Sequence, residues 1–404
     1  MEQSRLNPDS RQYDNTNMKE YRKIRAIVSG GGTGGHIFPA LSIADRLKEV
    51  NPDSEILFVG AEGKMEMEKV PAAGYKIIGL PVAGLQRRLA VSNLTLPFKL
   101  LRSLSMAGKV IDSFRPDIAI GVGGYASAPL LWMASRKGIP TLIQEQNGFA
   151  GLANRILGKK AGCICTAYDN MERFFPADRI VLTGNPIRKD IVPADTEMRE
   201  EALKFYGLDP GKRHIFIVGG SLGSRTLNMS VMKWIGDGCP GGEDVEIIWQ
   251  CGRYYKAEAD SFMEMHREQA SVVHHSDFIA RMDLAYAAAD AVVSRSGASS
   301  VSELCAAHKA VIFVPSPNVT EDHQTHNAMA LVEKDAAIIV RDCDAEQTLM
   351  DTACRLVHDR ERISSLEKNI AALAKRDAAG AIVDEIYKVI RNSGRSADRA
   401  GETI

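Results

Sequence analysis

The chain of 404 residues is too long for one ordinary hydrophobic core, so its length favours two domains. Its 50 basic and 51 acidic residues give a formal charge of −1, so no overall field attracts a polyanion and nucleic acid is not an expected partner. Seven cysteines without a Cys-x-x-Cys pair indicate a reduced, cytosolic compartment.

The first 22 residues are expected to form a polar, disordered leader. They lack the apolar middle of a signal peptide. Elsewhere too, no apolar run approaches the roughly 20 residues needed to cross a bilayer. The sequence therefore predicts no membrane-spanning helix.

Residues 23–186 predict a doubly wound α/β domain. Short apolar runs rich in branched residues alternate with segments of helix length, as expected for buried parallel strands covered by helices. The predicted strands lie in residues 24–28, 55–60, 76–82, 117–123, 140–146, 162–168 and 179–185.

Residues 187–372 predict a second α/β domain of the same kind. Pro186 and Pro193 interrupt regular structure and indicate a linker before it. Its predicted strands lie in residues 214–220, 245–252, 271–278, 290–297, 310–316 and 336–342. Residues 373–404 are predicted to contain a C-terminal helix, and periodicity leaves open whether it packs on the second domain or returns to the first.

A glycine-rich loop follows the first strand of each predicted domain. The first is "SGGGTGGHIFPA", residues 29–40, and the second is "GGSLGS", residues 219–224. Glycines permit close approach of a ligand to the backbone, and the helix that follows offers unpaired N–H groups to a phosphate. One such loop could be only a tight strand-to-helix turn. Two loops at equivalent places favour ligand binding at the carboxyl ends of the strands.

His36 ends the first loop. An isolated histidine in the first turn of a helix commonly faces solvent. At this position, however, it would project toward a ligand at the carboxyl end of the sheet, where it could act as a general base.

Residues 294–304, "SRSGASSVSEL", follow another predicted strand. The serines could simply cap the helix that begins there. Capping does not account for Glu303, a carboxylate placed to accept two hydroxyl groups of a ribose. Two further polar segments, residues 121–129 and 144–154, also follow predicted strands and are more typical of a site than of a core.

These motifs together resemble the MurG family of glycosyltransferases, family 28, which add N-acetylglucosamine to lipid I. The resemblance is carried, in this order, by "GGTGGHIFPA", "GVGGYASAP", "EQNGFAGLAN", "TGNPIR", "VGGSLGSRTLN", "RSGASSVSEL" and "DHQTHNA". They span residues 30–328. The resemblance implies a GT-B fold, in which two Rossmann-like domains face each other across a cleft, with the acceptor and membrane side in the first and the UDP-N-acetylglucosamine site in the second.

The resemblance also implies roles for individual residues. In the first domain, Thr33, Gly34 and Gly35 resemble loop contacts to donor or acceptor, as does Asn147. Arg188 and Ser221 resemble phosphate contacts of the donor, and the main chain of Ile279 resembles a reader of uracil. The diphosphate and ribose would be cradled by Ala298, Ser299, Ser300, Val301, Ser302 and Glu303. The sugar hydroxyls would be read by His323, Gln324 and Asn327.

The implied reaction inverts the anomeric carbon. The 4-hydroxyl of the muramoyl sugar of lipid I attacks C1 of the donor, UDP leaves, and lipid II forms, with His36 as the candidate base. No cofactor or metal is implied. Three departures from the family pattern, Gln144, Ala128 and Leu222, concern fine acceptor contacts and leave this reaction class unchanged.

A polyprenyl-linked acceptor implies peripheral attachment to the cytoplasmic face of a bacterial inner membrane. Residues 85–116 mix basic and apolar side chains, a combination that favours an anionic lipid surface. The predicted membrane face consists of Leu85, Arg87, Arg88, Leu96, Phe98 and Lys99. For residues 100–111 the favoured interpretation is an ordinary amphipathic helix whose leucines face its own core.

Other functions remain as alternatives. A UDP-N-acetylglucosamine 2-epimerase shares the two-domain fold, as does a GT-B transferase with another acceptor. A nicotinamide dehydrogenase would use Glu62 on the ribose, although the second glycine loop argues against it. A binding module without chemistry is the plainest option. Asp342-Cys343-Asp344 could suggest a metal-held donor, but helix capping, well away from the loops, is the favoured interpretation.

Overall fold

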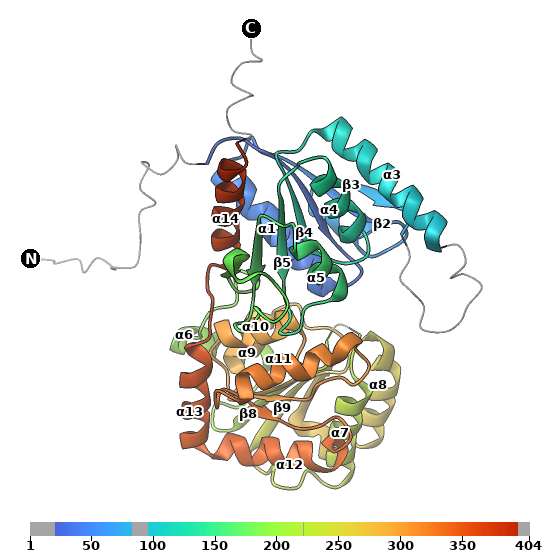
Figure 1. The fold of residues 1–404 in the computed structure, drawn as a ribbon. Helices are drawn as coiled ribbons and strands as arrows, with labels where there is room; N and C mark the ends of the chain where they lie inside the picture. Colours follow the sequence, from blue (N-terminus) through green and yellow to red (C-terminus); the bar gives the residue numbers. More distant parts are fainter. Residues whose placement is uncertain (1–20, 83–95, 221, 395–404) are drawn as a thin grey trace, which may run out of the picture. The chain divides into compact units, whose positions relative to one another are not determined.

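The computed structural model describes residues 21–82, 96–220 and 222–394. The chain forms two compact units, coloured by sequence in Figure 1. Of the described residues, unit 1 comprises 21–82, 96–144, 160–163 and 380–394, and unit 2 comprises 145–159, 164–220 and 222–379.

The first sheet has seven strands in the order β3-β2-β1-β4-β5-β6-β7, and every pairing within it whose register is known is parallel. The strands are β1 Arg25–Gly30, β2 Glu55–Ala61, β3 Lys76–Leu80, β4 Ile118–Gly123, β5 Thr141–Glu145, β6 Cys163–Thr166 and β7 Ile180–Leu182. The helices that accompany them are α1 Gly34–Val50, α2 Glu66–Ala72, α3 Leu96–Phe114, α4 Ser127–Arg136 and α5 Leu152–Gly158. The chain order reverses beside β1, which places β1 and β4 at the topological switch point where ligands bind in such sheets.

The second sheet has six parallel strands in the order β10-β9-β8-β11-β12-β13. The strands are β8 Arg213–Val218, β9 Val245–Gln250, β10 Val273–Ser276, β11 Ala291–Ser294, β12 Val311–Phe313 and β13 Ile338–Ile339. The helices of this half are α6 Thr196–Tyr206, α7 Arg225–Gly236, α8 Lys256–Met265, α9 Met282–Ala288, α10 Ala298–Ala306, α11 His323–Val332, α12 Ala345–His358 and α13 Arg360–Ala371. Its switch point lies between β8 and β11.

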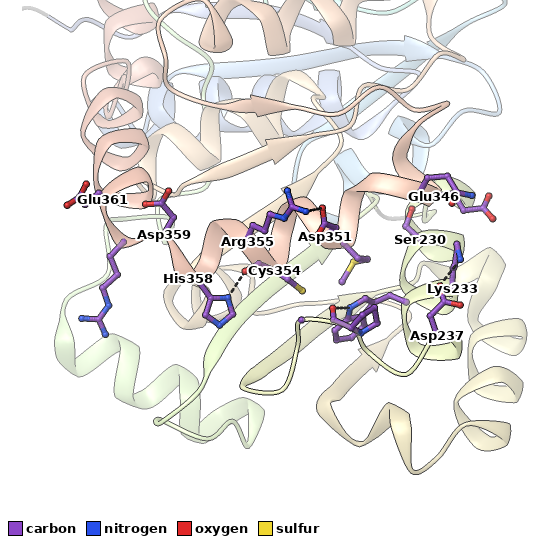
Figure 2. A pocket seen from close by; sticks show the side chains of 16 residues that line it. Ser230, Lys233, Asp237, Glu346, Asp351, Cys354, Arg355, His358, Asp359 and Glu361 are labelled. Atoms are coloured by element: carbon purple, nitrogen blue, oxygen red, sulfur yellow. Dashed lines mark hydrogen bonds and ion pairs between the residues drawn. The ribbon is translucent and has the colours of Figure 1, made fainter.

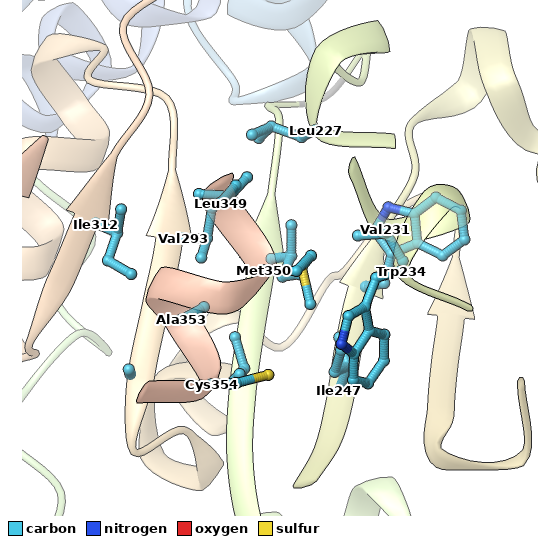
Figure 3. Packing of buried hydrophobic residues seen from close by; sticks show 14 of the residues in the cluster. Leu227, Val231, Trp234, Ile247, Val293, Ile312, Leu349, Met350, Ala353 and Cys354 are labelled. Atoms are coloured by element: carbon cyan, nitrogen blue, oxygen red, sulfur yellow. The ribbon is translucent and has the colours of Figure 1, made fainter. Parts of the chain in front are cut away.

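Each sheet is buried under helices, as the two-faced apolar runs predict. On one face of the second sheet, α7 contributes Leu227, Val231 and Trp234 to a core completed by Leu349 and Met350 of α12 (Figure 3). Ile247, Val293 and Ile312 supply the strand side of this core. Two parallel α/β sheets with helical cover confirm the predicted fold class.

The last helix, α14 Ala378–Asn392, packs within unit 1 from Gly380 onward. The Tyr387 hydroxyl donates to the carbonyl of Arg22 at 2.8 Å, and its ring lies edge-on to Tyr21. Val389 of α14 packs closely on Gly162: a Cβ added to Gly162 would lie 2.9 Å from a methyl carbon of Val389. The C-terminal helix and residues 21–22 therefore pack on one another within unit 1.

Candidate active site

The first glycine loop lies at the switch point of the first sheet. It leaves β1 after Gly30 and enters α1 at Gly34. The Gly31 amide donates to the carbonyl of Gly123 at 3.2 Å, and a Cβ on Gly124 would lie 2.5 Å from the Gly31 oxygen. The predicted motifs "SGGGTGG" and "GVGG" are thus packed backbone against backbone, a contact that requires glycine.

His36 lies in the first turn of α1, as the glycine-rich sequence before it predicts. Its Nδ1 is 3.1 Å from the carbonyl oxygen of Gly31 and 3.3 Å from the hydroxyl of Thr33. The other edge of the ring lies against Gly123, where a Cβ would come within 2.6 Å of Nε2. Thr33, Gly34, Gly35 and His36 therefore form one short segment whose histidine is held by the two loops of the switch point.

The second glycine loop has a comparable place in unit 2. Gly219 and Gly220 follow β8, and Ser224 caps α7 by accepting from the Leu227 amide at 3.4 Å. Ser221 itself lies outside the described residues. The Gln250 side chain donates to the Gly220 carbonyl at 2.9 Å, and Arg295 donates to the Ser224 hydroxyl at 2.6 Å. Side chains from β9 and from the end of β11 thus brace this loop.

Arg295 also pairs with Asp342, with 2.5 Å between guanidinium and carboxylate, and the same carboxylate accepts from Thr226 at 3.1 Å. Asp342 therefore lies beside the start of α7, and its expected position well away from the loops was wrong. Asp344, at the N-terminus of α12, makes no capping bond and pairs with Arg341 instead, so the expected capping was also wrong. The error arose because local periodicity does not show which helices pack together, and α12, which begins just after Asp342, packs against α7.

The helix α10 carries the predicted ribose and diphosphate segment. It begins at Ala298 after Gly297, and no side chain caps it, so the capping interpretation of the serines does not hold for this end. Ala298, Ser299, Ser300, Ser302 and Glu303 are partly exposed, whereas Val301 is buried. Ser302 also accepts from Asn185, which sequence analysis did not single out, at 3.1 Å.

Glu303 is the carboxylate of this segment. Tyr286 donates its hydroxyl to Glu303 at 3.2 Å. Burial raises the pKa of Glu303 to about 7, although the Tyr286 bond and the charge of Arg188 act in the opposite direction. Arg188 itself is paired with Asp190 at 2.6 Å. A carboxyl group poised near neutrality beside a cation is typical of functional sites.

Asparagine and glutamine side chains form a connected amide cluster in unit 2. Asn327 accepts from the Gly148 amide at 2.8 Å and donates to the side chain of Asn147 at 3.2 Å. The Gln324 side chain accepts from the Ser316 amide at 2.8 Å, and its main-chain carbonyl accepts from the Ser296 hydroxyl. The Ser296 carbonyl accepts from Asn327 at 3.2 Å, which joins the two residues. The predicted contacts Asn147, Gln324 and Asn327, 180 residues apart at most, thus lie in one network, with the partly exposed His323 on the same helix, α11.

Ile279, the predicted reader of uracil, is buried, and its amide donates to the Gln250 side chain at 3.0 Å. Gln250 thereby joins this main chain to Gly220 of the glycine loop. Because the Ile279 amide is already bonded to Gln250, the main-chain group of Ile279 that remains for a uracil ring is its carbonyl oxygen.

A surface pocket of about 880 Å³ lies elsewhere in unit 2, between α7 and α12 (Figure 2). It contains none of the predicted site residues. Several of its ionisable side chains form pairs: Lys233 with Asp237, Arg355 with Asp351 and His358 with Asp244. Because α7 begins at the glycine loop but reaches the pocket at its other end, we do not assign the reaction to it.

The predicted membrane face is described only in part. Leu85, Arg87 and Arg88 lie outside the described residues, as does the side chain of Leu96. Phe98 is 76% exposed, and Lys99 is exposed beside it on α3. Leu100 and Leu101 are 52% and 65% exposed, so the expectation that the leucines of residues 100–111 face the core was wrong for these two. Among the described side chains of the helix, Ala107 and Ile111 are the buried apolar ones. The buried stripe, which packs mainly against α4, thus starts one turn later than the leucines suggested.

Within the described residues, no helix is both long and apolar enough to span a bilayer. The same part of the chain shows no group of three or more His, Cys, Asp or Glu side chains placed to hold a metal ion.

Comparison with known proteins gives matches over most of the chain. Residues 26–166 match the Glycosyltransferase family 28 N-terminal domain, and residues 214–382 match the Glycosyltransferase family 28 C-terminal domain. A protein of Parabacteroides distasonis, named UDP-N-acetylglucosamine--N-acetylmuramyl-(pentapeptide) pyrophosphoryl-undecaprenol N-acetylglucosamine transferase, is 57% identical over 369 residues, which is 91% of this chain and 99% of that protein. A protein of Cytophaga hutchinsonii with the same name is 50% identical and covers 92% of this chain and 99% of its own.

Solved structures agree in fold. The crystal structure of Acinetobacter baumannii MurG matches with a TM-score of 0.73 and 27% identity, over 91% of this chain and 100% of that one. A putative UDP-N-acetylglucosamine 2-epimerase from Listeria monocytogenes matches with a TM-score of 0.66, over 92% of this chain and 98% of that one. Its identity of 13% makes this a likeness of fold alone.

Proposed function

The chain belongs to glycosyltransferase family 28, and from this membership we propose that it transfers N-acetylglucosamine from UDP-N-acetylglucosamine to N-acetylmuramyl-(pentapeptide) pyrophosphoryl-undecaprenol, lipid I. The product is lipid II, used in peptidoglycan synthesis. The observation that carries the proposal is 57% identity to a transferase of that name over 91% of the chain.

The reaction is a single displacement that inverts the anomeric carbon. The 4-hydroxyl oxygen of the muramoyl sugar forms a bond to C1 of the donor, while the bond from C1 to the phosphate oxygen breaks and UDP leaves with the bonding electrons. Nε2 of His36 accepts the hydroxyl proton. The carbonyl oxygen of Gly31 has no hydrogen to give, so the contact at 3.1 Å favours a proton on Nδ1 and leaves Nε2 as the accepting nitrogen.

The donor binds through unit 2. The amide hydrogens at the starts of α7 and α10 and the side chains of Ser221 and Arg188 meet the diphosphate as negative charge grows on it. Glu303 accepts the ribose hydroxyls, and the main chain of Ile279 reads uracil. Asn147, His323, Gln324 and Asn327 read the sugar hydroxyls. The contacts of Asn327 with Gly148 and Asn147 support this last role, since they hold its amide in one orientation.

The acceptor is reached at the cytoplasmic face of the membrane, through the face around residues 85–99 extended by Leu100 and Leu101. Exposed apolar side chains with Lys99 among them support this proposal, because such a surface gains both burial and attraction to anionic lipid, at ~1 kcal/mol per nearby cation. Charge reversal at Arg87, Arg88 and Lys99 should weaken binding to vesicles that contain anionic lipid. Unchanged sedimentation with those vesicles would refute the membrane face.

Incubation with labelled UDP-N-acetylglucosamine and a lipid I analogue tests the reaction. We expect transfer of the labelled sugar with release of UDP. Formation of the 2-epimer without transfer would identify an epimerase on the same fold, and binding without any product would identify a module without chemistry. Either result would overturn the proposal.

A further inference from the structure

One peptide group of the first glycine loop is held between two ionisable side chains. The peptide joins Gly31 to Gly32. Its oxygen faces Nδ1 of His36 at 3.1 Å, and its N–H donates to Oε2 of Glu66 at 2.9 Å. Carboxylate, peptide and imidazole therefore form a continuous hydrogen-bonded row.

Glu66 is built into this place. It is the first residue of α2 and is only 1% exposed. Its second oxygen, Oε1, accepts from the Ala61 amide at 3.0 Å, so both carboxylate oxygens receive main-chain hydrogens. A buried carboxylate is costly unless hydrogen bonds of this kind compensate the loss of water.

The glycines beside Glu66 make room for its carboxyl group. A Cβ on Gly31 would lie 2.2 Å from Oε1, and a Cβ on Gly60 would lie 2.6 Å from Cγ of the same side chain. Two backbone positions thus exclude a side chain because Glu66 occupies the space. This accounts for part of the glycine content of the first loop without any ligand.

We propose that Glu66 is a positioning residue for His36, acting through the peptide between Gly31 and Gly32. The proposal rests on the proposed function, in which His36 is the base. Glu66 fixes the plane of this peptide and polarises it. A hydrogen bond from the Gly32 N–H to a carboxylate increases the negative charge on the Gly31 oxygen of the same peptide, which makes that oxygen a stronger acceptor. The stronger acceptor holds the proton on Nδ1 and stabilises the imidazolium that forms when Nε2 takes the hydroxyl proton.

Thr33 offers a competing explanation, since its hydroxyl is 3.3 Å from the same Nδ1. A hydroxyl can donate or accept and therefore does not select a tautomer. A carbonyl can only accept, so the Gly31 contact selects one. We accordingly expect Thr33→Val to change the tautomer less than a substitution of Glu66.

The first test is the tautomer of His36, read by ¹⁵N-resolved NMR of the ring in the full-length wild-type protein, at about pH 8, where an ordinary imidazole is neutral. We expect the Nδ1–H form to dominate. A ring protonated mainly on Nε2 would overturn the proposal even if the protein proves to be an active transferase. The measurement also needs no acceptor substrate, so it can be made whether or not sugar transfer is found.

The second test is a double-mutant cycle of Glu66→Gln with His36→Ala. Glutamine keeps one acceptor oxygen, but its NH₂ group would face one of the two main-chain N–H groups, of Gly32 and Ala61, that Glu66 accepts from. Two donors cannot bond to each other, so the hydrogen-bonded row from residue 66 to His36 is disrupted. We expect kcat to fall on the order of tenfold in Glu66→Gln, less than the roughly 10²–10⁴-fold loss of a general base, with the KM for UDP-N-acetylglucosamine unchanged. Added to His36→Ala, the same substitution should cost no further kcat. Independent, multiplicative losses would show a merely structural role.

Glu68→Gln is the matched control, because it removes one carboxylate from the same helix at an exposed position. It should leave kcat and the tautomer unchanged. If Glu66→Gln does not fold, Glu66→Asp, which keeps two acceptor oxygens on a shorter side chain, takes its place in the cycle. An active His36→Ala enzyme would instead remove His36 as the base, an outcome separate from that of the tautomer measurement.

Discussion

The two glycine loops share a backbone design but differ in what braces them. Each follows the first strand of its sheet, begins a helix at the switch point and contains a glycine at φ +86°, Gly32 in the first and Gly220 in the second. The first loop is braced by a buried carboxylate, Glu66, on the Gly32 amide. The second is braced by the Gln250 amide on the Gly220 carbonyl and by Arg295 at Ser224.

From this difference we expect the two similar loops to bind different ligands. An anion at the Gly32 amide would have to displace a carboxylate already bonded to that N–H. In the second loop, Gln250 holds the Gly220 carbonyl by a hydrogen bond, and the guanidinium of Arg295 lies at the start of α7. A cation and a helix N-terminus both favour a negatively charged diphosphate. We therefore expect the second loop to bind the donor and the first loop to contact the reacting hydroxyl.

The largest expected effect separates the loops by kinetics. His36→Ala should lower kcat roughly 10²–10⁴-fold, because the hydroxyl proton loses its acceptor. UDP affinity, measured by calorimetry, should stay within a factor of two or so of the wild type. Near-normal turnover in this variant would remove His36 from the chemistry.

Arg295→Met should break the second loop instead. It leaves Asp342 without its cation and removes the donor to Ser224. Truncating one partner of a fully buried pair costs about 3–5 kcal/mol, and this pair, 13% and 22% exposed in its side chains, should lose somewhat less. Thermal unfolding and UDP titration should show lower stability and weaker binding together. Retained UDP affinity in a destabilised protein would show that Arg295 supports the fold and not the loop.

Glu303→Gln sharpens the assignment of the donor to unit 2. A carboxylate accepting two ribose hydroxyls is worth about 1.5–3 kcal/mol per bond at most, so we expect a loss of UDP affinity of roughly tenfold or more. Because the pKa of Glu303 is about 7, wild-type affinity should rise as the pH increases through that value. The affinity of the glutamine variant should not change with pH in this range.

The same pKa predicts a change in stability of opposite sign. The folded protein keeps the Glu303 proton to about pH 7, whereas the pKa of an unperturbed glutamate carboxyl group is 4.5. This group's contribution to stability is therefore fully present below pH 4.5 and is lost as the pH rises through about 7. The free energy of unfolding of Glu303→Gln minus that of the wild type should therefore be more positive at pH 8 than at pH 5. Equal differences at the two pH values would contradict the raised pKa.

Sequence patterns predicted the parts of this comparison that are local. The two sheets, both glycine loops and His36 at the first helix start follow from apolar runs and glycine spacing. Glu66, Arg295 and Asn185 were not predicted as site residues, because their partners Gly32, Asp342 and Ser302 are 34, 47 and 117 residues away. Those contacts depend on strand order, which periodicity does not specify. Leu100 and Leu101 were misassigned for a related reason: an amphipathic pattern predicts an apolar stripe but not the residue at which that stripe becomes buried against a neighbouring helix.

The smallest expected effect comes from a matched pair of alanine substitutions, one in each glycine loop. Gly32 and Gly220 have the same φ of +86°, and a Cβ on either would meet no heavy atom of the described residues within 4 Å. Alanine at each position should therefore cost a similar ~1–2 kcal/mol of backbone strain, visible as similar shifts in thermal unfolding. Their kinetic effects should differ: Gly32→Ala disturbs the peptide row to His36 and lowers kcat, whereas Gly220→Ala disturbs the donor loop and raises the KM for UDP-N-acetylglucosamine. Because strain and local space are similar, a difference in kinetics would reflect the different roles of the loops, which are positioning of His36 in the first and donor binding in the second. The same kinetic change in both variants would mean that the loops do not divide donor from acceptor.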